Sequence, residues 1–250
     1  MRLTRRSSTT LAATDADELI TGYGHYVDER AATTLIGAGM SLRAGYRGWV
    51  QLLEPIQAEL GIDIIDDMPL LAQYYVDASR DGRARLDQHI IDTFNAVGDP
   101  DPALAHRLLA QLSIDEFWTT NFDPLLERAT GNAYVFAKDA ELASVRVEPG
   151  RRRVNKMHGS IEPPGPLVLT RNDYEQYPTT HPRFWQLPQA QFLTQTFLFL
   201  GFSFTDPNLE LVFRLARTHT PDTPREHFAI MKEPDGSGRH SPAGWNQRLS

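Results

Sequence analysis

Hydrophobic positions along the chain alternate between two kinds of pattern. Short runs of β-branched and apolar residues predict buried strands at 31–39, 116–121, 133–137, 152–159, 166–170, 196–202 and 227–231. Between most of these runs, apolar residues recur at spacings of three and four, as they do on one face of a helix. Strands that alternate with helices predict an α/β protein with a Rossmann-like parallel sheet and helices on both faces.

Helical periodicity is also found before and between these strands. A helix capped by Thr14 or Asp15 is expected to run to about Arg30. The segment 49–60 is amphipathic, and Pro55 within it should kink or split the helix.

The pattern from Met68 to Leu112 is helical throughout. We therefore expect one domain over 15–250 that carries a helical insertion at about 61–112. A flexible polar arm at 1–14 is expected to precede it, and the chain is expected to be the N-terminal domain of a longer protein.

Composition narrows the classes of function. The absence of cysteine excludes a disulfide framework, a thiolate nucleophile and a cysteine zinc site. A formal net charge of −7 argues against direct nucleic-acid binding by this domain. The most apolar run, 192–202, is too short and too polar to span a bilayer, and the N-terminal residues lack the apolar stretch of a signal peptide. We expect a cytoplasmic protein without a membrane partner.

Four of the predicted strands end in small or polar residues. These ends read LIGAGMS (35–41), WTTNFDPLLERA (118–129), KMHGS (156–160) and FLGFSFTDPNL (199–209). Because the carboxyl ends of parallel strands meet at one edge, where open α/β sheets bind ligands, the four ends together predict a ligand site.

Each strand end taken alone also has a simpler interpretation. The glycine turn at 37–39 lacks the third glycine of the dinucleotide-binding fingerprint. Asn121 or Asp123 can cap a helix that begins at Pro124, and a lone His158 is more often bonded to the backbone. The order of the four ends is therefore more informative than any one of them.

In this order, the four strand ends resemble the SIR2-like superfamily, and more narrowly its bacterial branch found in antiphage defence proteins. Residues 37–41 are similar to the GAGxS phosphate loop, 119–123 to the TQN-I-D segment, and 158–159 to the histidine–glycine pair that carries the catalytic base. Residues 201–203 are similar to the GTS segment, and the DPNL stretch at 206–209 is characteristic of the bacterial branch. The resemblance covers about residues 15–232.

This chain departs from the pattern of deacylating sirtuins in two ways that bear on the reaction. Deacylating sirtuins insert a four-cysteine zinc module after the histidine, which a chain without cysteine cannot form. The stretch 160–200 is also too short for the usual acyl-lysine channel. The resemblance therefore implies a metal-free NAD+ glycohydrolase that cleaves NAD+ to nicotinamide and ADP-ribose, as the toxic effector of an antiphage defence system.

The resemblance also implies roles for individual residues. Asn121 would orient the ribose and the attacking water, and His158 would be the base. Asp123 would hold the nicotinamide carboxamide. The diphosphate would lie against Gly37, Ala38, Gly39 and Ser41, and the adenosine side against Gly201, Ser203 and Asp206, with Asn208 and Arg43 as weaker candidates.

Three alternatives stay open beside this interpretation: an NAD-dependent ADP-ribosyltransferase, a deacylase, or a non-catalytic module that senses NAD or ADP-ribose. Retention of both Asn121 and His158 favours an enzyme, since binding alone needs neither. An unrestrained NAD+ hydrolase would harm its host. We therefore expect control by a regulatory partner protein, a fused sensor domain or a homo-oligomer, and the preference for NAD+ or NADP+ is left open.

Overall fold

The computed structural model describes residues 2–7, 10–14, 16–63, 67–144, 148, 150–162, 165–202 and 226–231. Its strands are β1 (Arg2–Ser7), β2 (Thr10–Thr14), β3 (Ala32–Ile36), β4 (Glu116–Thr119), β5 (Tyr134–Phe136), β6 (Arg153–Lys156), β7 (Thr196–Leu200) and β8 (His227–Met231). Its α-helices are α1 (Ala16–Asp28), α2 (Trp49–Leu60), α3 (Met68–Asp77), α4 (Gly82–Asn95), α5 (Leu104–Leu109), α6 (Leu125–Thr130), α7 (Glu141–Ser144), α8 (Arg171–Thr180) and α9 (Pro182–Thr194). Two 3₁₀ turns, η1 (Ala38–Met40) and η2 (Leu42–Ala44), follow β3.

The strands form one sheet in the order β2-β1-β8-β7-β3-β4-β6-β5. All neighbours from β8 to β5 pair in parallel, whereas β1 pairs antiparallel with both β2 and β8. The predicted α/β fold with a parallel sheet is confirmed. The chain leaves β3 toward β4 on one side and later returns to β7 on the other side of β3. The strand order therefore reverses between β3 and β7, and open α/β sheets bind ligands at such a reversal.

Successive residues of the central strands pack on opposite faces of the sheet. On one face, Leu35 and Trp118 pack in a cluster with Phe184 and Phe192 of α9. On the other face, Ile36 and Phe117 share a cluster with residues of α1, α5 and α6. This is the two-residue period of a strand. Because helices cover both faces, the strands read as continuous apolar runs.

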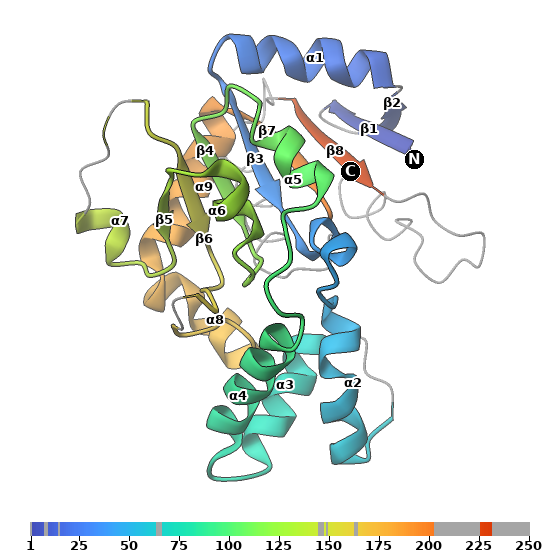
Figure 1. The fold of residues 1–250 in the computed structure, drawn as a ribbon, viewed down its shortest axis with the longest axis vertical. Coiled ribbons are helices and arrows are strands. Elements are labelled where there is room, and N and C mark those ends of the chain that lie inside the picture. Colours follow the sequence, from blue (N-terminus) through green and yellow to red (C-terminus); the bar gives the residue numbers. More distant parts are fainter. Residues whose placement is uncertain are drawn as a thin grey trace.

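Helices α2, α3 and α4 form a separate group beyond the ends of the strands (Figure 1). Their core includes Tyr75 and Phe94, while Tyr74 is exposed. The core of this group also contains Phe122 and Leu125, which follow β4. The helical group therefore packs directly on the loop that leaves one of the central strands.

Two of the expected local structures differ from the observed ones. Helix α2 continues through Pro55, which does not split it. Pro55 and Gln51 are both exposed, so water can replace the hydrogen bond that proline cannot donate. The predicted strand at 166–170 is wrong. Val168 N–H donates to the carbonyl of His158, and Leu169 and Thr170 N–H donate to the carboxylate of Asp173.

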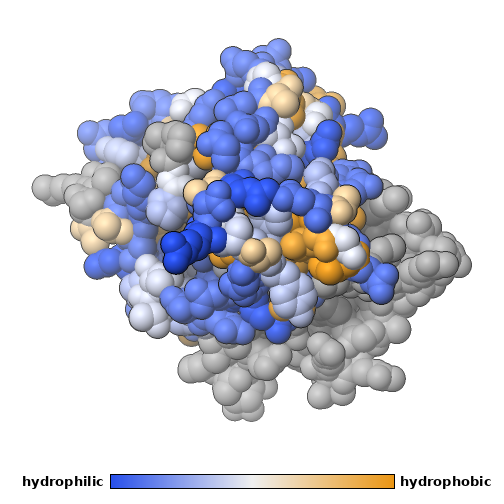
Figure 2. Space-filling view, turned by 90° about the horizontal axis from the view of Figure 1, so that it is seen from below, coloured by the Kyte–Doolittle hydropathy of each residue, from blue (hydrophilic) through white to orange (hydrophobic). Residues whose placement is uncertain are grey.

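The N-terminal residues also differ from the expected polar arm. Residues 2–7 and 10–14 form the hairpin of β1 and β2, which extends the sheet beyond β8. Within the described part of the chain, no helix is long and apolar enough to cross a membrane. The end of the molecule that carries α2–α4 is mainly hydrophilic (Figure 2). Exposed apolar side chains on and beside these helices include Leu42, Val50 and Tyr74.

Candidate active site

The glycine turn after β3 lies in direct contact with the chain that leaves β7. Gly37 N–H donates to the carbonyl of Leu200 at 2.8 Å, and Gly39 N–H donates to that of Gly201 at 2.9 Å. A Cβ atom on Gly37 or Gly39 would lie 2.8 Å from the oxygen of Gly201. The two glycines are therefore required first for the close approach of two backbone segments.

Gly201 is the residue after β7 that packs against the glycine turn, and it too must be glycine. Its φ of +70° lies in the left-handed region, and a Cβ there would lie 2.6 Å from the nitrogen of Met40. The N–H of Gly39 is already bonded within the protein, whereas Ala38 begins η1, and the first N–H of a helical turn has no partner within that turn. Ala38 is thus the position in the glycine turn best suited to donate to a ligand.

Asn121 is held rigidly at the end of β4. Its Nδ2 donates to the carbonyl of Gly37 at 3.2 Å and to Oγ of Ser41 at 3.1 Å. Its N–H donates to Oγ1 of Thr119 at 3.0 Å, and that hydroxyl in turn donates to the carbonyl of Ile36. Both Nδ2 contacts are with acceptors, so they fix which way the amide points.

The amide oxygen of Asn121, Oδ1, is a buried acceptor without a hydrogen-bond donor among the described residues. The side chain is only 8% exposed, and among the described residues nothing donates a hydrogen bond to its Oδ1. A buried polar oxygen without a donor costs free energy unless a ligand or water satisfies it. Oδ1 can therefore accept a hydrogen bond from a hydroxyl group or a water molecule in the site.

His158 lies at the corresponding end of the neighbouring strand. Thr119 of β4 pairs with Lys156 of β6, so Asn121 and His158 each lie two residues beyond this pair. The imidazole is buried, and its edge contacts Tyr174 and Tyr177, with ring centroids 5.4 and 6.2 Å away. The ring is therefore packed between fixed aromatic walls.

The backbone around His158 is equally constrained. Tyr177 Oη donates to the carbonyl of Met157 at 2.8 Å, and Val168 N–H donates to that of His158 at 3.0 Å. Gly159 has a φ of +92°, and a Cβ there would lie 2.2 Å from the carbonyl oxygen of Pro166. Only glycine fits after the histidine, because the 166–170 segment packs against it.

Asp123 and Ser41 both have structural contacts in addition to their predicted roles. Asp123 is buried, and its Oδ1 accepts from the N–H of Leu125 at 3.1 Å in a turn that precedes α6. Helix α6 begins one residue later than expected, with Pro124 as its N-cap residue. The Ser41 hydroxyl is buried and supports Asn121. Arg43 is exposed on η2, and Ser203, Asp206 and Asn208 lie outside the described residues.

Sequence reasoning missed Lys156, which is fully buried beneath the site. Its Nζ donates to the carbonyls of Phe122 at 3.1 Å and Asp123 at 2.7 Å, and it forms an ion pair with Glu127. Burial raises the pKa of Glu127, and the Lys156 ammonium opposes that shift. A lysine in a predicted strand, two residues before His158 and in a chain with few lysines, is the signal that could have identified it.

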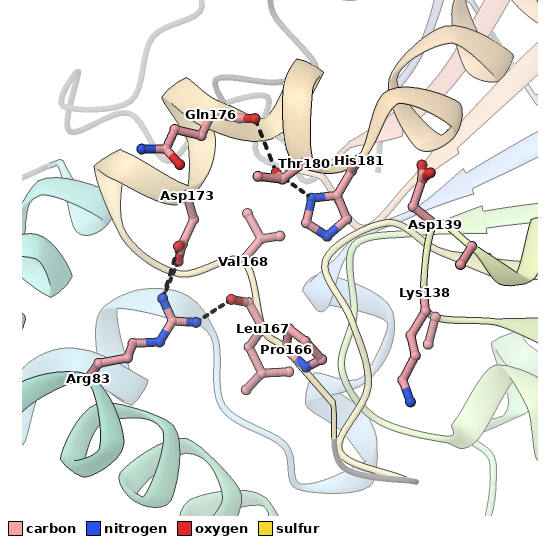
Figure 3. A pocket seen from close by; sticks show the side chains of 12 residues that line it. Arg83, Lys138, Asp139, Pro166, Leu167, Val168, Asp173, Gln176, Thr180 and His181 are labelled. Carbon is pink, nitrogen blue, oxygen red and sulfur yellow. Dashed lines mark hydrogen bonds and ion pairs between the residues drawn. The ribbon is translucent and has the colours of Figure 1, made fainter.

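A cleft of about 470 Å³ lies between α8, the 166–168 segment and residues 137–140, with His181 among its lining residues (Figure 3). Arg83 of α4 forms one wall, with bonds of 2.9 and 2.7 Å to Asp173 and 2.6 Å to the carbonyl of Leu167. None of the predicted site residues lines this cleft. Its wall instead links the helical group to the segment that supports the backbone of His158.

No metal-binding cluster of three or more histidine, aspartate or glutamate side chains occurs in the described ranges. The arrangement consists of a fixed amide acceptor, a buried imidazole and a tight glycine turn at the carboxyl ends of adjacent parallel strands. It can orient a hydroxyl group and accept a proton beside a bound nucleotide.

Comparison with known proteins shows which family this chain is similar to. A family model described as a SIR2-like domain matches residues 115–249. The chain is 37% identical over 213 residues to the NAD(+) hydrolase ThsA of Bacillus cereus (strain MSX-D12), which covers 83% of this chain and 44% of that protein. It is 36% identical over 226 residues to the ThsA of Enterococcus faecium, covering 88% of this chain and 47% of that protein.

A more distant relative is the Defense-associated sirtuin 2 of Bacillus subtilis, at 24% identity over 212 residues, with 80% of this chain and 20% of that protein covered. The chain thus spans less than half the length of each of these curated relatives.

Proposed function

This chain belongs to the SIR2-like domain family, and from that premise we propose that it is an NAD+ glycohydrolase that releases nicotinamide and ADP-ribose. The observation that carries the proposal is the Asn121 amide, whose Nδ2 is fixed by two acceptors while its buried Oδ1 has no donor among the described residues. Relatives named NAD(+) hydrolase support the same reaction.

The chemistry requires little acid catalysis. The bond between C1′ of the ribose and the ring nitrogen breaks, and its electron pair returns to nicotinamide, which leaves as a neutral molecule. Positive charge develops on the ribose in an oxocarbenium-like transition state. Water then bonds to C1′ and releases one proton. The protein must position the ribose and the water and accept that proton.

Each buried group has a place in this scheme. Oδ1 of Asn121 accepts a hydrogen bond from a ribose hydroxyl or from the attacking water. His158 takes the proton as the general base. Asp123 orients the nicotinamide carboxamide, and the turn at Gly37–Ser41 lies against the diphosphate, with Ala38 as its donor. Gly201, Ser203 and Asp206 line the adenosine side.

We further propose that this activity serves defence against phage and is held in check by a partner protein, a fused domain or assembly of copies of the chain. The name of the Bacillus subtilis relative, a defence-associated sirtuin, supports the first part. The greater length of all the relatives leaves room for a fused regulatory domain in proteins of this kind.

The test follows nicotinamide and ADP-ribose by chromatography after incubation with NAD+ or NADP+. Wild type is compared with Asn121→Ala and His158→Ala, and with the exposed matched controls Asn95→Ala and His25→Ala. We expect turnover in wild type and both controls, and a loss of at least about 100-fold in the two site variants.

Three outcomes would contradict the proposal. Undiminished turnover in both site variants would mean that the site is elsewhere. ADP-ribose attached to protein, seen as a mass increase, would support a transferase. Binding of NAD+ by calorimetry without any turnover would support a sensor module.

A further inference from the structure

Lys156 uses its full hydrogen-bonding capacity inside the protein. An ammonium group has three donors. Here they meet three acceptors: the carbonyls of Phe122 and Asp123 and the carboxylate of Glu127. The side chain has no exposed surface, and Glu127 is itself largely buried. The charge is therefore fully paired but withdrawn from water.

The acceptors all belong to the segment that begins with Asn121, while Lys156 lies two residues before His158. Phe122 and Asp123 follow Asn121 directly, and Glu127 lies on α6, one turn further along the chain. The ammonium thus joins the loop after β4 to the end of β6. Beyond the paired strands, the Ile161 N–H also reaches across to the carbonyl of Phe122, at 3.1 Å.

Stability alone does not account for a charged group at this position. Withdrawing an ammonium and a carboxylate from water costs several kcal/mol per ion, and apolar residues of similar volume are often as stable or more so. What a buried pair adds is a fixed geometry, because it is satisfied only when its acceptors lie in one arrangement. In this molecule that arrangement spaces the two strand ends that carry Asn121 and His158.

We propose that Lys156 is a positioning residue that sets the placement of Asn121 relative to His158 by holding the two carbonyls after Asn121, with Glu127 as its counter-ion. The inference rests on the proposed function for its effect on turnover. Lys156 acts through the backbone and contacts no substrate. Glu127 balances the charge of the ammonium, whereas the two carbonyl contacts fix the position of the loop after β4.

The test separates the carbonyl contacts from the ion pair. Glu127→Gln removes the carboxylate charge but leaves the ammonium on both carbonyls. Lys156→Met together with Glu127→Gln removes the ammonium without stranding a buried carboxylate. The exposed pair Arg30 and Asp115, changed to Met and Asn, is the matched control.

We expect kcat for nicotinamide release to stay within about 3-fold of wild type in Glu127→Gln and in the exposed control. In the double variant kcat should fall by about 10- to 100-fold while KM changes by less than about 3-fold, because small misplacements of reacting groups are costly. Thermal unfolding is followed for each variant, and all assays are run well below the lowest midpoint. A folded double variant with wild-type kcat overturns the proposal.

Hydrogen exchange provides a readout that does not depend on NAD+. Peptides covering 120–127 and 156–161 should exchange faster in the double variant, with the rest of the sheet unchanged. If wild type shows no turnover, the proposed function fails, and exchange alone decides the positioning role; unchanged protection of both peptides overturns it.

If the double variant does not fold, Lys156→Gln with Glu127→Gln replaces it, since the shorter amide keeps two donors. Faster exchange of the two peptides with reduced kcat then supports the proposal. Faster exchange with unchanged kcat overturns it.

Discussion

Nδ2 of Asn121 donates a hydrogen bond of 3.1 Å to Oγ of Ser41, which ties the end of β4 to the turn after β3. The same Nδ2 also bonds to the carbonyl of Gly37, so the amide is held at two points of one turn. A residue expected to lie beside the diphosphate therefore also orients the amide that we place at the ribose.

This relationship predicts the effect of Ser41→Ala. The amide keeps its bond to Gly37 but loses the second point of attachment, so its Oδ1 is less well placed. One hydrogen bond corresponds to about 1 kcal/mol, and we expect kcat to fall about 5-fold and the free energy of unfolding by about 1 kcal/mol. Steady-state assays and urea denaturation measure the two. Ser79→Ala, in the turn before α4, should change neither, and wild-type kcat in Ser41→Ala would refute the role.

The contact between the glycine turn and Gly201 predicts a large cost for Gly201→Ala. The methyl group would meet the nitrogen of Met40 at 2.6 Å and would also require a left-handed backbone. Gly61 is a matched control, because it has a φ of +62° and a Cβ there would meet no atom within 4 Å. We expect the free energy of unfolding to fall by about 1 kcal/mol in Gly61→Ala and by about 2–5 kcal/mol in Gly201→Ala. Equal losses in urea titrations would show that the steric contact is unimportant.

The hydrogen bonds of Arg83 connect helices α2–α4 to the 166–170 segment, and they predict that this helical group affects His158. Arg83→Met removes the bonds to Asp173 and Leu167, although the part-exposed guanidinium limits the loss to about 1 kcal/mol of unfolding free energy. Because the 166–170 segment supports His158, we also expect a lower kcat. Arg85→Met, which breaks an exposed pair with Glu59, should leave kcat unchanged. Equal kinetics in the two variants would argue against the link.

The lowered pKa of the buried His106 predicts that the stability of the fold depends on pH. Burial lowers the pKa of this histidine below its ordinary value of 6.5, while Asp123 acts in the opposite direction. The unfolded state then binds a proton more readily than the folded state as pH falls below about 6.5, so acidification favours unfolding. Between about pH 7.5 and 5.5, the thermal midpoint should fall less in His106→Gln than in wild type.

Part of that dependence should survive in His106→Gln, because burial also lowers the pKa of His181. The exposed variant His25→Gln should follow the wild-type profile. A His106→Gln profile identical to wild type would exclude the contribution of this histidine.

Most strands could be predicted from the sequence because both faces of the sheet are buried, which makes each strand a continuous apolar run. The run at 166–170 has a similar apolar composition, but Leu169 and Thr170 N–H bond to Asp173, whose carboxylate forms with Thr170 the capping box at the start of α8. The bond from Val168 N–H to the carbonyl of His158 joins residues further apart, and it leaves no local pattern. The strand ends at Asn121 and His158 could be found from their polar residues. Lys156 could be singled out only as a rare lysine near His158; its contacts could not be predicted, because only the folded structure shows which carbonyls surround a side chain.

The pairing of β3 has a consequence for how the protein is made. Ala32 pairs with Thr196, and the N-terminal strand β1 pairs with β8 near the other end of the described chain. During synthesis the middle strand of the sheet must therefore wait for a partner about 160 residues downstream, and loop closure over such a span is slow. Until then the edge of the five-residue strand β3 that faces β7 stays open to other nascent chains, and ribosome-associated chaperones should matter more for this protein than its ordinary size suggests.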